Sequence, residues 1–300
     1  MQPKLVVITG PTASGKTALG VALAQRLGGE VVSADSMQIY RGMDIGTAKP
    51  TPEEMQGVPH HMIDIADPTE NYSVSRYAEE ASACVDDILA RGKLPIVVGG
   101  TGLYIDSLIA GRTFADGTAD TALRQELSER YDEIGGEGLL GELRKVDPER
   151  AAKLHPADKK RIVRAMEVYI LTGRTITQHN EETKRLPPRY RPVWLGMTFR
   201  DRADLYARID LRVEQMLEQG LVAEVERLLA RYGAAVTCFC LMGGDAEPHE
   251  AARLALFARR LRPALRTGWY SGRAALPEGF DPTGVFDYVK LGPYIAARGP

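Results

Sequence analysis

Apolar residues along the first 111 positions form short runs separated by longer amphipathic stretches. Three runs are rich in β-branched residues and predict strands at residues 5–9, 30–33 and 94–98. In residues 75–91, apolar or small side chains recur at the three- and four-residue spacings of a helix. Strands that alternate with helices indicate a parallel sheet covered on both faces. We therefore expect an α/β fold.

The pattern changes after Gly111. Residues 115–185 contain mostly helix formers, many of them arginine and lysine, and no strand-like run. A strand-like run returns at 192–197, and a long helical stretch follows at 202–231. From about residue 234 the chain reads as a strand, a glycine turn and a helix. The predicted parts are a core of residues 1–113 and 190–232, a helical insertion of 114–189 and a small α/β C-terminal part of 233–300.

Residues 10–17, GPTASGKT, form a complete phosphate-binding loop between the first predicted strand and the first predicted helix. In that context backbone N–H groups and the helix N-terminus point at one anion. Lys16 adds a positive charge, and the Thr17 hydroxyl can hold Mg²⁺. The residues expected to bind phosphate are Gly10, Pro11, Thr12, Ala13, Ser14, Gly15, Lys16 and Thr17. The loop indicates a P-loop NTPase-like core. It does not identify the phosphate compound that binds or the reaction that follows.

Two polar residues follow the other predicted strands, and the carboxyl ends of parallel strands share one edge of the sheet. Asp35 comes after the second strand and suits a general base or a Mg²⁺ ligand, or a helix N-cap or turn. Thr101 lies in the glycine-rich turn after the third strand. It is a candidate for contact with a substrate, or part of a strand-to-helix connection.

Three further features have alternative interpretations. His60 and His61 are adjacent and cannot share one face, which favours a structural or substrate-loop role over a metal site. Cys238 and Cys240 are read as small buried apolar residues rather than as a disulfide or zinc pattern. The basic stretch 153–164 is either a solvated helix face or a grip on a nucleic-acid backbone.

Charge and hydropathy restrict the function classes. The net charge is −2, so a nucleic-acid surface would have to be local. We find no apolar run long enough to span a membrane and no secretory leader. A cytoplasmic location is the expectation.

Five segments together resemble the bacterial tRNA dimethylallyltransferases, in the order and spacing of that family. They are GPTASGKT, SADSMQIYRGMDIGTAKP, GVPHHMIDI-ADPTENYSVSRY, PIVVGGTGLYIDSLIAG and HPADKKRIVRAMEVYILTGR. The resemblance covers residues 4 to about 230. It implies transfer of a dimethylallyl group from dimethylallyl diphosphate to the N6 amine of an adenosine next to the anticodon (position 37) of tRNA.

The resemblance also implies roles for individual residues. Asp35 would be the general base, Lys16 would stabilise the leaving diphosphate with Mg²⁺ near Thr17, and Thr101 would hold the substrate. The tRNA anticodon stem-loop would meet the helical insertion, and the target base would be flipped out of its stack. The expected tRNA contacts are Asp35, Ser36, Met37, Gln38, Thr101, Arg124, Lys159, Lys160, Arg161, Ile162, Val163 and Arg164. We expect a monomer on tRNA.

The C-terminal part departs from that family. From about residues 221–232 onward the sequence resembles the C-terminal half of an anaerobic ribonucleotide reductase activating protein, a radical-SAM family. Residues 242–245, MGGD, would match its S-adenosylmethionine turn. The three-cysteine cluster motif is absent, so we expect no radical chemistry. The chain is read as a chimera whose tail is of foreign type.

Two alternatives remain open from the sequence. One is another P-loop enzyme, such as a small-molecule kinase or an enzyme that prenylates free adenine nucleotides. The other is a truncated or fused protein that binds phosphate or tRNA without catalysis. Transfer of a labelled prenyl group to tRNA would distinguish them.

Overall fold

The computed structural model describes residues 2–111, 120–185, 187–242 and 247–292. The chain divides into two compact units, residues 1–219 and residues 220–300, and each is described by itself. The helical stretch expected at residues 202–231 is two helices, α9 (Arg202–Glu218) and α10 (Leu221–Tyr232). They separate at Gly220, whose φ of 97° lies in the left-handed region that glycine adopts easily.

The first unit contains a five-stranded parallel sheet with the strand order β3-β2-β4-β1-β5. The strands are β1 (Lys4–Thr9), β2 (Gly29–Ser33), β3 (His60–His61), β4 (Leu94–Val98) and β5 (Arg191–Gly196). The central strands are apolar on both faces because helices cover both. The predicted α/β fold with a parallel sheet is therefore confirmed.

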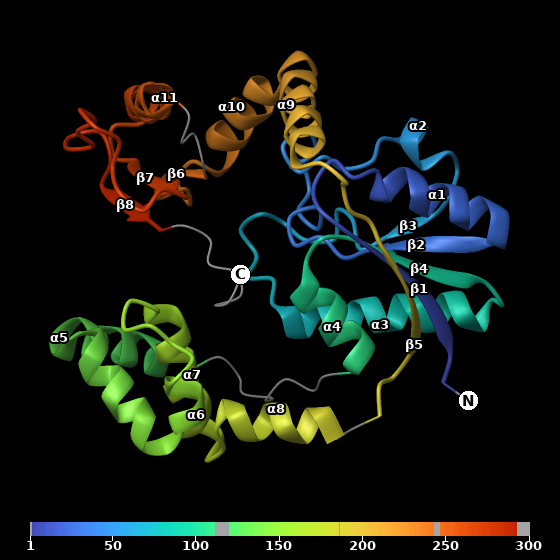
Figure 1. The fold of residues 1–300 in the computed structure, drawn as a ribbon, viewed down its shortest axis with the longest axis horizontal. Helices are drawn as coiled ribbons and strands as arrows, with labels where there is room; N and C mark the ends of the chain where they lie inside the picture. Colours follow the sequence, from blue (N-terminus) through green and yellow to red (C-terminus); the bar gives the residue numbers. More distant parts are fainter. Residues whose placement is uncertain (1, 112–119, 186, 243–246, 293–300) are drawn as a thin grey trace. The chain divides into compact units, whose positions relative to one another are not determined.

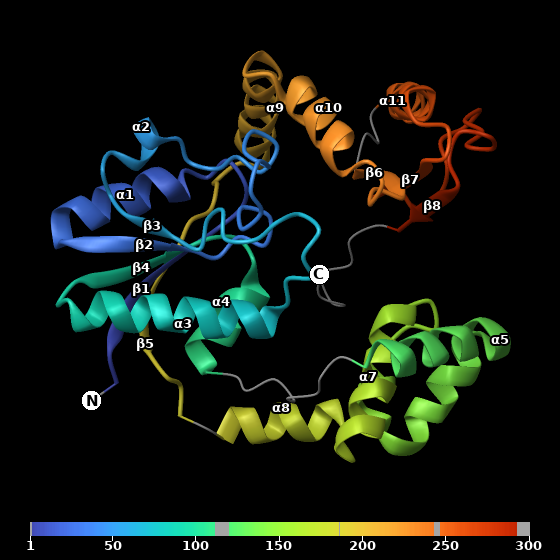
Figure 2. The same ribbon diagram turned by 180° about the vertical axis from the view of Figure 1, so that it is seen from behind.

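Helices lie on both faces of this sheet (Figures 1 and 2). One core joins alternate residues of β1, β2 and β4 to α3 (Val74–Ala90) and α4 (Gly102–Ala110). The opposite core joins the intervening residues to α1 (Lys16–Leu27). Successive side chains of a strand point to opposite faces of the sheet, so the same strands contribute residues to both cores. A short helix, α2 (Pro52–Met55), precedes β3.

Among its described residues, the regular elements of the predicted insertion are all helices. It contains α5 (Thr121–Val146), α6 (Pro148–Ala151), α7 (Lys159–Thr172) and α8 (Ile176–Arg185). At Gly135 the backbone of α5 leaves the helical region, so α5 is two helices joined by a kink. The next residue, Gly136, lets the Pro156 carbonyl approach to within 2.1 Å of where a Cβ would lie. Leucines of α5 pack on α7 to form a separate core.

Among its described residues, the second unit has a three-stranded parallel sheet of order β6-β7-β8, and helix α11 packs on it. Its elements after α10 are β6 (Cys238–Met242), α11 (Pro248–Leu261), β7 (Arg266–Ser271) and β8 (Tyr288–Leu291). Trp269 is fully buried, stacked on Phe286 and edge-on to Phe280. The sequence predicted β6 and α11; it did not predict β7 and β8. Of residues 242–245, only Met242 lies within the described residues.

Candidate active site

The ends of β2 and β4 are joined by backbone hydrogen bonds. The Ala34 N–H donates to Val98 O (2.8 Å), and the Thr101 N–H donates to Ala34 O (3.1 Å). Gly99 makes this approach feasible, because a Cβ there would lie 2.2 Å from Ala34 O. The junction therefore brings the segment that carries Asp35 next to Thr101, at the sheet edge where the phosphate loop leaves β1.

The phosphate loop has left-handed backbone at Ala13 (φ 61°) and Gly15 (φ 85°), and α1 begins at Lys16. The Lys16 ammonium group lies over the loop and donates to Gly10 O (2.9 Å) and Pro11 O (2.8 Å). Within the described residues, the buried Ser14 Oγ has no hydrogen-bond partner. A buried hydroxyl without a partner is costly, and a phosphate oxygen would satisfy it.

Two arginines of α9 reach the same loop, and the sequence analysis did not identify them. Arg208 lies at hydrogen-bond range of the Ala13 carbonyl (3.4 Å). Burial of Lys16 and, next, the charge of Arg212 lower the pKa of Lys16, while Asp35 acts in the opposite direction. The arginines stand one helical turn apart, a spacing that could have identified them in the predicted helix. Lys16, Arg208 and Arg212 thus place three positive charges at or near the loop, which favours a highly charged anion.

Asp35 forms a turn and still keeps one carboxylate oxygen available. Its Oδ1 accepts from the N–H groups of Met37 (2.8 Å) and Gln38 (3.3 Å), as the turn alternative requires. Its Oδ2 has no hydrogen-bond partner within the described part of the chain. The turn fixes the carboxylate and leaves Oδ2 able to accept a proton, so the two interpretations are compatible.

Thr101 is tied to the same turn. Its Oγ1 accepts from the Ser36 N–H (3.1 Å) and lies 3.4 Å from Ser36 Oγ. Met37 is 44% exposed beside them. Asp35, Ser36, Met37 and Thr101 therefore form one small surface.

Gln38 differs from its neighbours because its side-chain amide is already engaged. Its Oε1 accepts from Ser33 Oγ (3.1 Å), and its Nε2 donates to Thr47 O (3.3 Å) and Ala48 O (3.1 Å). Both amide protons are used within the protein. A nucleotide contact by this side chain, as predicted, would have to break one of these bonds.

The insertion pairs two predicted tRNA-contacting arginines with one buried carboxylate. Glu167 is fully buried and accepts from Arg124 (3.0 Å) and Arg164 (2.8 Å). Each arginine is partly exposed and keeps donors for another partner. Both residues therefore have a structural role, which adds to their predicted contact with RNA.

The remaining predicted contacts of α7 fall into two groups. Lys160 and Arg161 are exposed, and Lys159 is paired with Asp132 (2.6 Å). Ile162 and Val163 are 0% and 5% exposed and belong to the core of the insertion. Their side chains cannot touch RNA in this structure, because helical periodicity turns them inward. Contact of these two residues with tRNA stays a prediction, and in this structure it would not come from their side chains.

The adjacent histidines have structural partners. His60 Nδ1 lies 2.8 Å from Val58 O, and His61 Nε2 lies 2.8 Å from Glu30 Oε2. They form the edge strand β3. No cluster of three or more His, Cys, Asp or Glu side chains with metal-binding geometry occurs among the described residues. Thr17 follows Lys16 in the first turn of α1 and offers a hydroxyl oxygen, a type of ligand that magnesium accepts.

Cys238 and Cys240 lie on one face of β6, with their sulfur atoms 3.5 Å apart. Cys240 is exposed and Cys238 is partly exposed, so they are not the buried pair expected. Burial and the neighbouring thiol raise the pKa of Cys238 to about 11.

Among the described helices, none is long and apolar enough to cross a membrane.

Residues 38–244 match the family described as IPP transferase. The chain belongs to this family. It is 51% identical over 225 residues to the tRNA dimethylallyltransferase of Acetivibrio thermocellus, covering 75% of this chain and 72% of that protein. The Symbiobacterium thermophilum tRNA dimethylallyltransferase is 51% identical over 243 residues, covering 81% and 76%.

Solved structures of the family are also similar. The full-length tRNA isopentenylpyrophosphate transferase of Bacillus halodurans has 46% identity and a TM-score of 0.52, covering 77% of this chain and 71% of that one. A eukaryotic dimethylallyltransferase, studied acting on tRNA, has 34% identity and a TM-score of 0.69, covering 78% and 57%. The resemblance to the dimethylallyltransferase family is therefore confirmed.

Proposed function

We propose that this chain transfers the dimethylallyl group of dimethylallyl diphosphate to the N6 amine of an adenosine next to the anticodon of tRNA. The observation that carries the proposal is the convergence of Lys16, Asp35 and Thr101 at one sheet edge, in a chain of this family. Such a transfer needs a loop that holds the diphosphate, a carboxylate oxygen that can take a proton, and a hydroxyl group in a fixed position.

The phosphate loop holds the leaving group. During transfer the bond between the allylic C1 and the diphosphate oxygen breaks, and its electron pair goes to the diphosphate. The loop amides, Lys16 and Arg212 lie where that charge develops, and preorganised donors stabilise it without reorganisation. A magnesium ion held by Thr17 would neutralise further charge on the diphosphate.

Asp35 takes the proton of the nucleophile. The N6 amine forms a bond to C1 and must lose a proton, which passes to Asp35 Oδ2. The two backbone donors on Oδ1 hold the carboxylate in a fixed orientation. Thr101 and Ser36 fix the other side of the same turn, so the base and the hydroxyl act from one rigid unit.

The helical insertion supplies the surface for tRNA. Lys160 and Arg161 are exposed on α7, and Arg124 and Arg164 present the outer part of their guanidinium groups around Glu167. Contacts of this type recognise backbone charge and shape rather than sequence. The cytoplasmic location and the monomeric state stay predictions.

For residues 233–300 we propose an origin outside this family, close to the radical-SAM activating proteins. The family match ends at residue 244, so most of this part lies outside it, and the second unit has its own hydrophobic core. An iron–sulfur cluster needs three cysteine ligands at cluster geometry, and this part of the sequence contains two cysteines. We therefore predict no radical chemistry for this segment.

A transfer assay tests the function. The purified chain is incubated with undermodified tRNA, Mg²⁺ and labelled dimethylallyl diphosphate, and label in the RNA is counted. We expect incorporation, and a loss of about 10²–10⁴-fold in kcat for Asp35→Asn with tRNA binding retained. Absence of label from the parent chain, while the Bacillus halodurans relative labels the same tRNA, would contradict the function and favour a binding protein without catalysis.

A further inference from the structure

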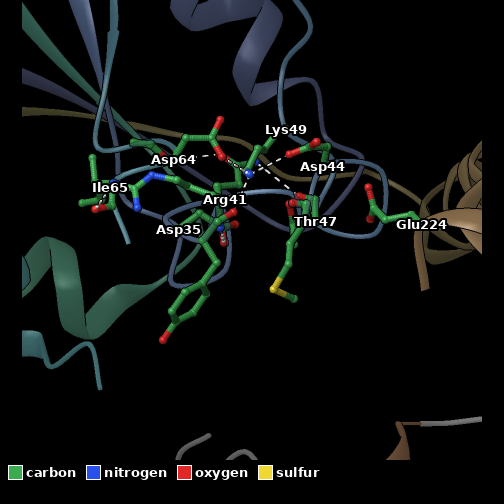
Figure 3. A network of polar contacts seen from close by, with 12 residues as sticks. Asp35, Arg41, Asp44, Thr47, Lys49, Asp64, Ile65 and Glu224 are labelled. Carbon is green, nitrogen blue, oxygen red and sulfur yellow. Dashed lines mark hydrogen bonds and ion pairs between the residues drawn. The ribbon is translucent and has the colours of Figure 1, made fainter. Parts of the chain in front are cut away.

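Lys49 is a buried cation beside the candidate active site. Its side chain is 5% exposed, and its ammonium group contacts Asp44 Oδ1 (2.8 Å), a carboxylate oxygen of Asp64, and the Tyr40 carbonyl (2.5 Å). Figure 3 shows Lys49 between Asp44 and Asp64. An ammonium group has three protons, and each has an acceptor here. Burying this charge is tolerable only because it is fully paired.

The partners of Lys49 belong to two segments that flank the stretch after Asp35. The segment 62–66 pairs with that stretch through its backbone: the Asp64 N–H donates to Gln38 O (3.1 Å) and the Ile65 N–H to Ile39 O (2.9 Å). The segment 40–49 follows directly and contributes Tyr40 and Asp44. Lys49 thus bridges the two segments that enclose Gln38.

Both bridged segments contain backbone that needs support. Ala48, Met62 and Asp64 have φ values of 49°, 64° and 55°, in the left-handed region that residues with a Cβ rarely occupy. Such conformations persist when surrounding contacts hold them. Ala48 immediately precedes Lys49, and Asp64 is one of its ion-pair partners, so the Lys49 contacts act where the backbone is least favourable.

A continuous set of hydrogen bonds leads from this clamp to the proposed base. The carbonyls of Thr47 and Ala48, next to Lys49, accept both amide protons of Gln38. The Gln38 N–H, together with that of Met37, donates to Asp35 Oδ1. Movement of the 40–49 segment would therefore shift Gln38 and loosen the turn that orients Asp35.

We propose that Lys49 is a positioning residue: it clamps segments 40–49 and 62–66 around Gln38 and thereby orients Asp35 toward the acceptor amine. The proposal rests on the function proposed above. It assigns Gln38 to the support of Asp35, in place of direct contact with the nucleotide. Misplacement of a base by about 1 Å can cost about 10²-fold in rate, so a clamp of this kind has a measurable effect.

The test compares Lys49→Met with Lys93→Met. Lys93 also pairs with a carboxylate, that of the buried Glu30 (2.7 Å), but it lies beside the start of β4, at the end of the sheet remote from the site. Both substitutions remove an ammonium group from a carboxylate. We expect kcat to fall about 10–10²-fold in Lys49→Met, with KM for dimethylallyl diphosphate within about twofold of the parent. Lys93→Met should keep both values.

Hydrogen exchange gives a second readout that needs no activity. The amides of Met37 and Gln38 are the two that Asp35 holds, so they should exchange about tenfold faster or more in Lys49→Met and unchanged in Lys93→Met. Equal effects of the two variants on kcat, or unchanged exchange at residues 37 and 38, would overturn the clamp. A parent chain without transfer would contradict the proposed function, and exchange alone would then decide the role of Lys49.

If Lys49→Met does not fold, a milder variant still tests the proposal. Asp64→Asn removes one charge but keeps an oxygen that accepts from Lys49. We expect a smaller decrease in kcat, about threefold to tenfold, with faster exchange at the same two amides. A full parental kcat with parental exchange in Asp64→Asn would count against the proposal.

Discussion

Gly99 is the residue at which the ends of β2 and β4 come closest. The carbonyl of Ala34 occupies the space that a side chain would need, 2.2 Å from an added Cβ. The neighbouring Gly100 has no heavy atom within 4 Å of that position. A side chain would therefore clash at Gly99 but not at Gly100. Only Gly99 is needed for the close approach that brings Asp35 near Thr101.

This difference predicts that alanine destabilises the protein at position 99 but has little effect at position 100. Gly99→Ala must push β2 and β4 apart, and we expect a loss of about 1–3 kcal/mol in the free energy of unfolding together with reduced transfer. Gly100→Ala should change stability by less than about 0.5 kcal/mol. Denaturant unfolding measures both, and equal stabilities of the two variants would contradict the close approach.

Lys16 links the charge of the phosphate loop to pH. Burial and Arg212 lower the pKa of Lys16, so its ammonium group loses its proton at a lower pH than that of an ordinary lysine, whose pKa is about 10.4. Below that lowered pKa the charge is present, and above it the charge is lost. The value of kcat/KM reports groups of the free enzyme, so it should decrease at alkaline pH earlier than an unperturbed lysine would allow.

The matched variant for this titration is Arg212→Gln. It removes the cation that disfavours protonation of Lys16, so the alkaline decrease should move to higher pH, while KM for dimethylallyl diphosphate rises because one cation is missing. A pH profile of kcat/KM for both proteins measures the shift. An alkaline decrease at the same pH in both would mean that Arg212 does not act on Lys16.

At the scale of elements, α7 has one face buried in the core of the insertion and another face exposed to solvent. Ile162, Val163 and Glu167 face the insertion core, and Lys160 and Arg161 face solvent. Lys160→Ala combined with Arg161→Ala should weaken tRNA binding across sequences and reduce the salt slope by about 1 per lost phosphate contact. Filter binding at several salt concentrations measures this.

The control for that experiment is Lys153→Ala. Lys153 is an exposed cation of the same basic stretch but lies before α7 and is paired with Glu149 (2.6 Å). It should leave the salt slope unchanged. If the double variant of α7 also keeps the parental slope, the helix is a solvated face and the RNA surface lies elsewhere.

The elements that sequence analysis predicted share a physical property. β1, β2 and β4 are buried on both faces, so their composition alone identifies them, and the phosphate loop has a fixed spacing. β3 is an edge strand of two histidines without an apolar pattern. Lys49 lacks a local signal as well, because it is buried by contacts with segment 62–66. Arg212 has a helical spacing from Arg208, but only the fold brings that helix to the phosphate loop.

At the scale of the whole molecule, each unit has its own hydrophobic core. The chain contains two tryptophans, and they report separately: Trp194 lies on β5 in the first unit, and Trp269 is buried in the second. Separate cores predict separate unfolding transitions. A ligand of the phosphate loop should then stabilise the first unit without affecting the second.

Inorganic diphosphate with Mg²⁺ is the appropriate probe, because it is the product that the phosphate loop would hold. At 100 times its Kd, it should add about 2.7 kcal/mol to the unfolding free energy of the unit that binds it. In Trp194→Phe, fluorescence follows Trp269 alone, and its denaturant midpoint should stay fixed. In Trp269→Phe, fluorescence follows Trp194, and its midpoint should rise. A joint rise of both midpoints would show that the two units unfold as one cooperative system, and the second unit would then contribute to the stability of the first.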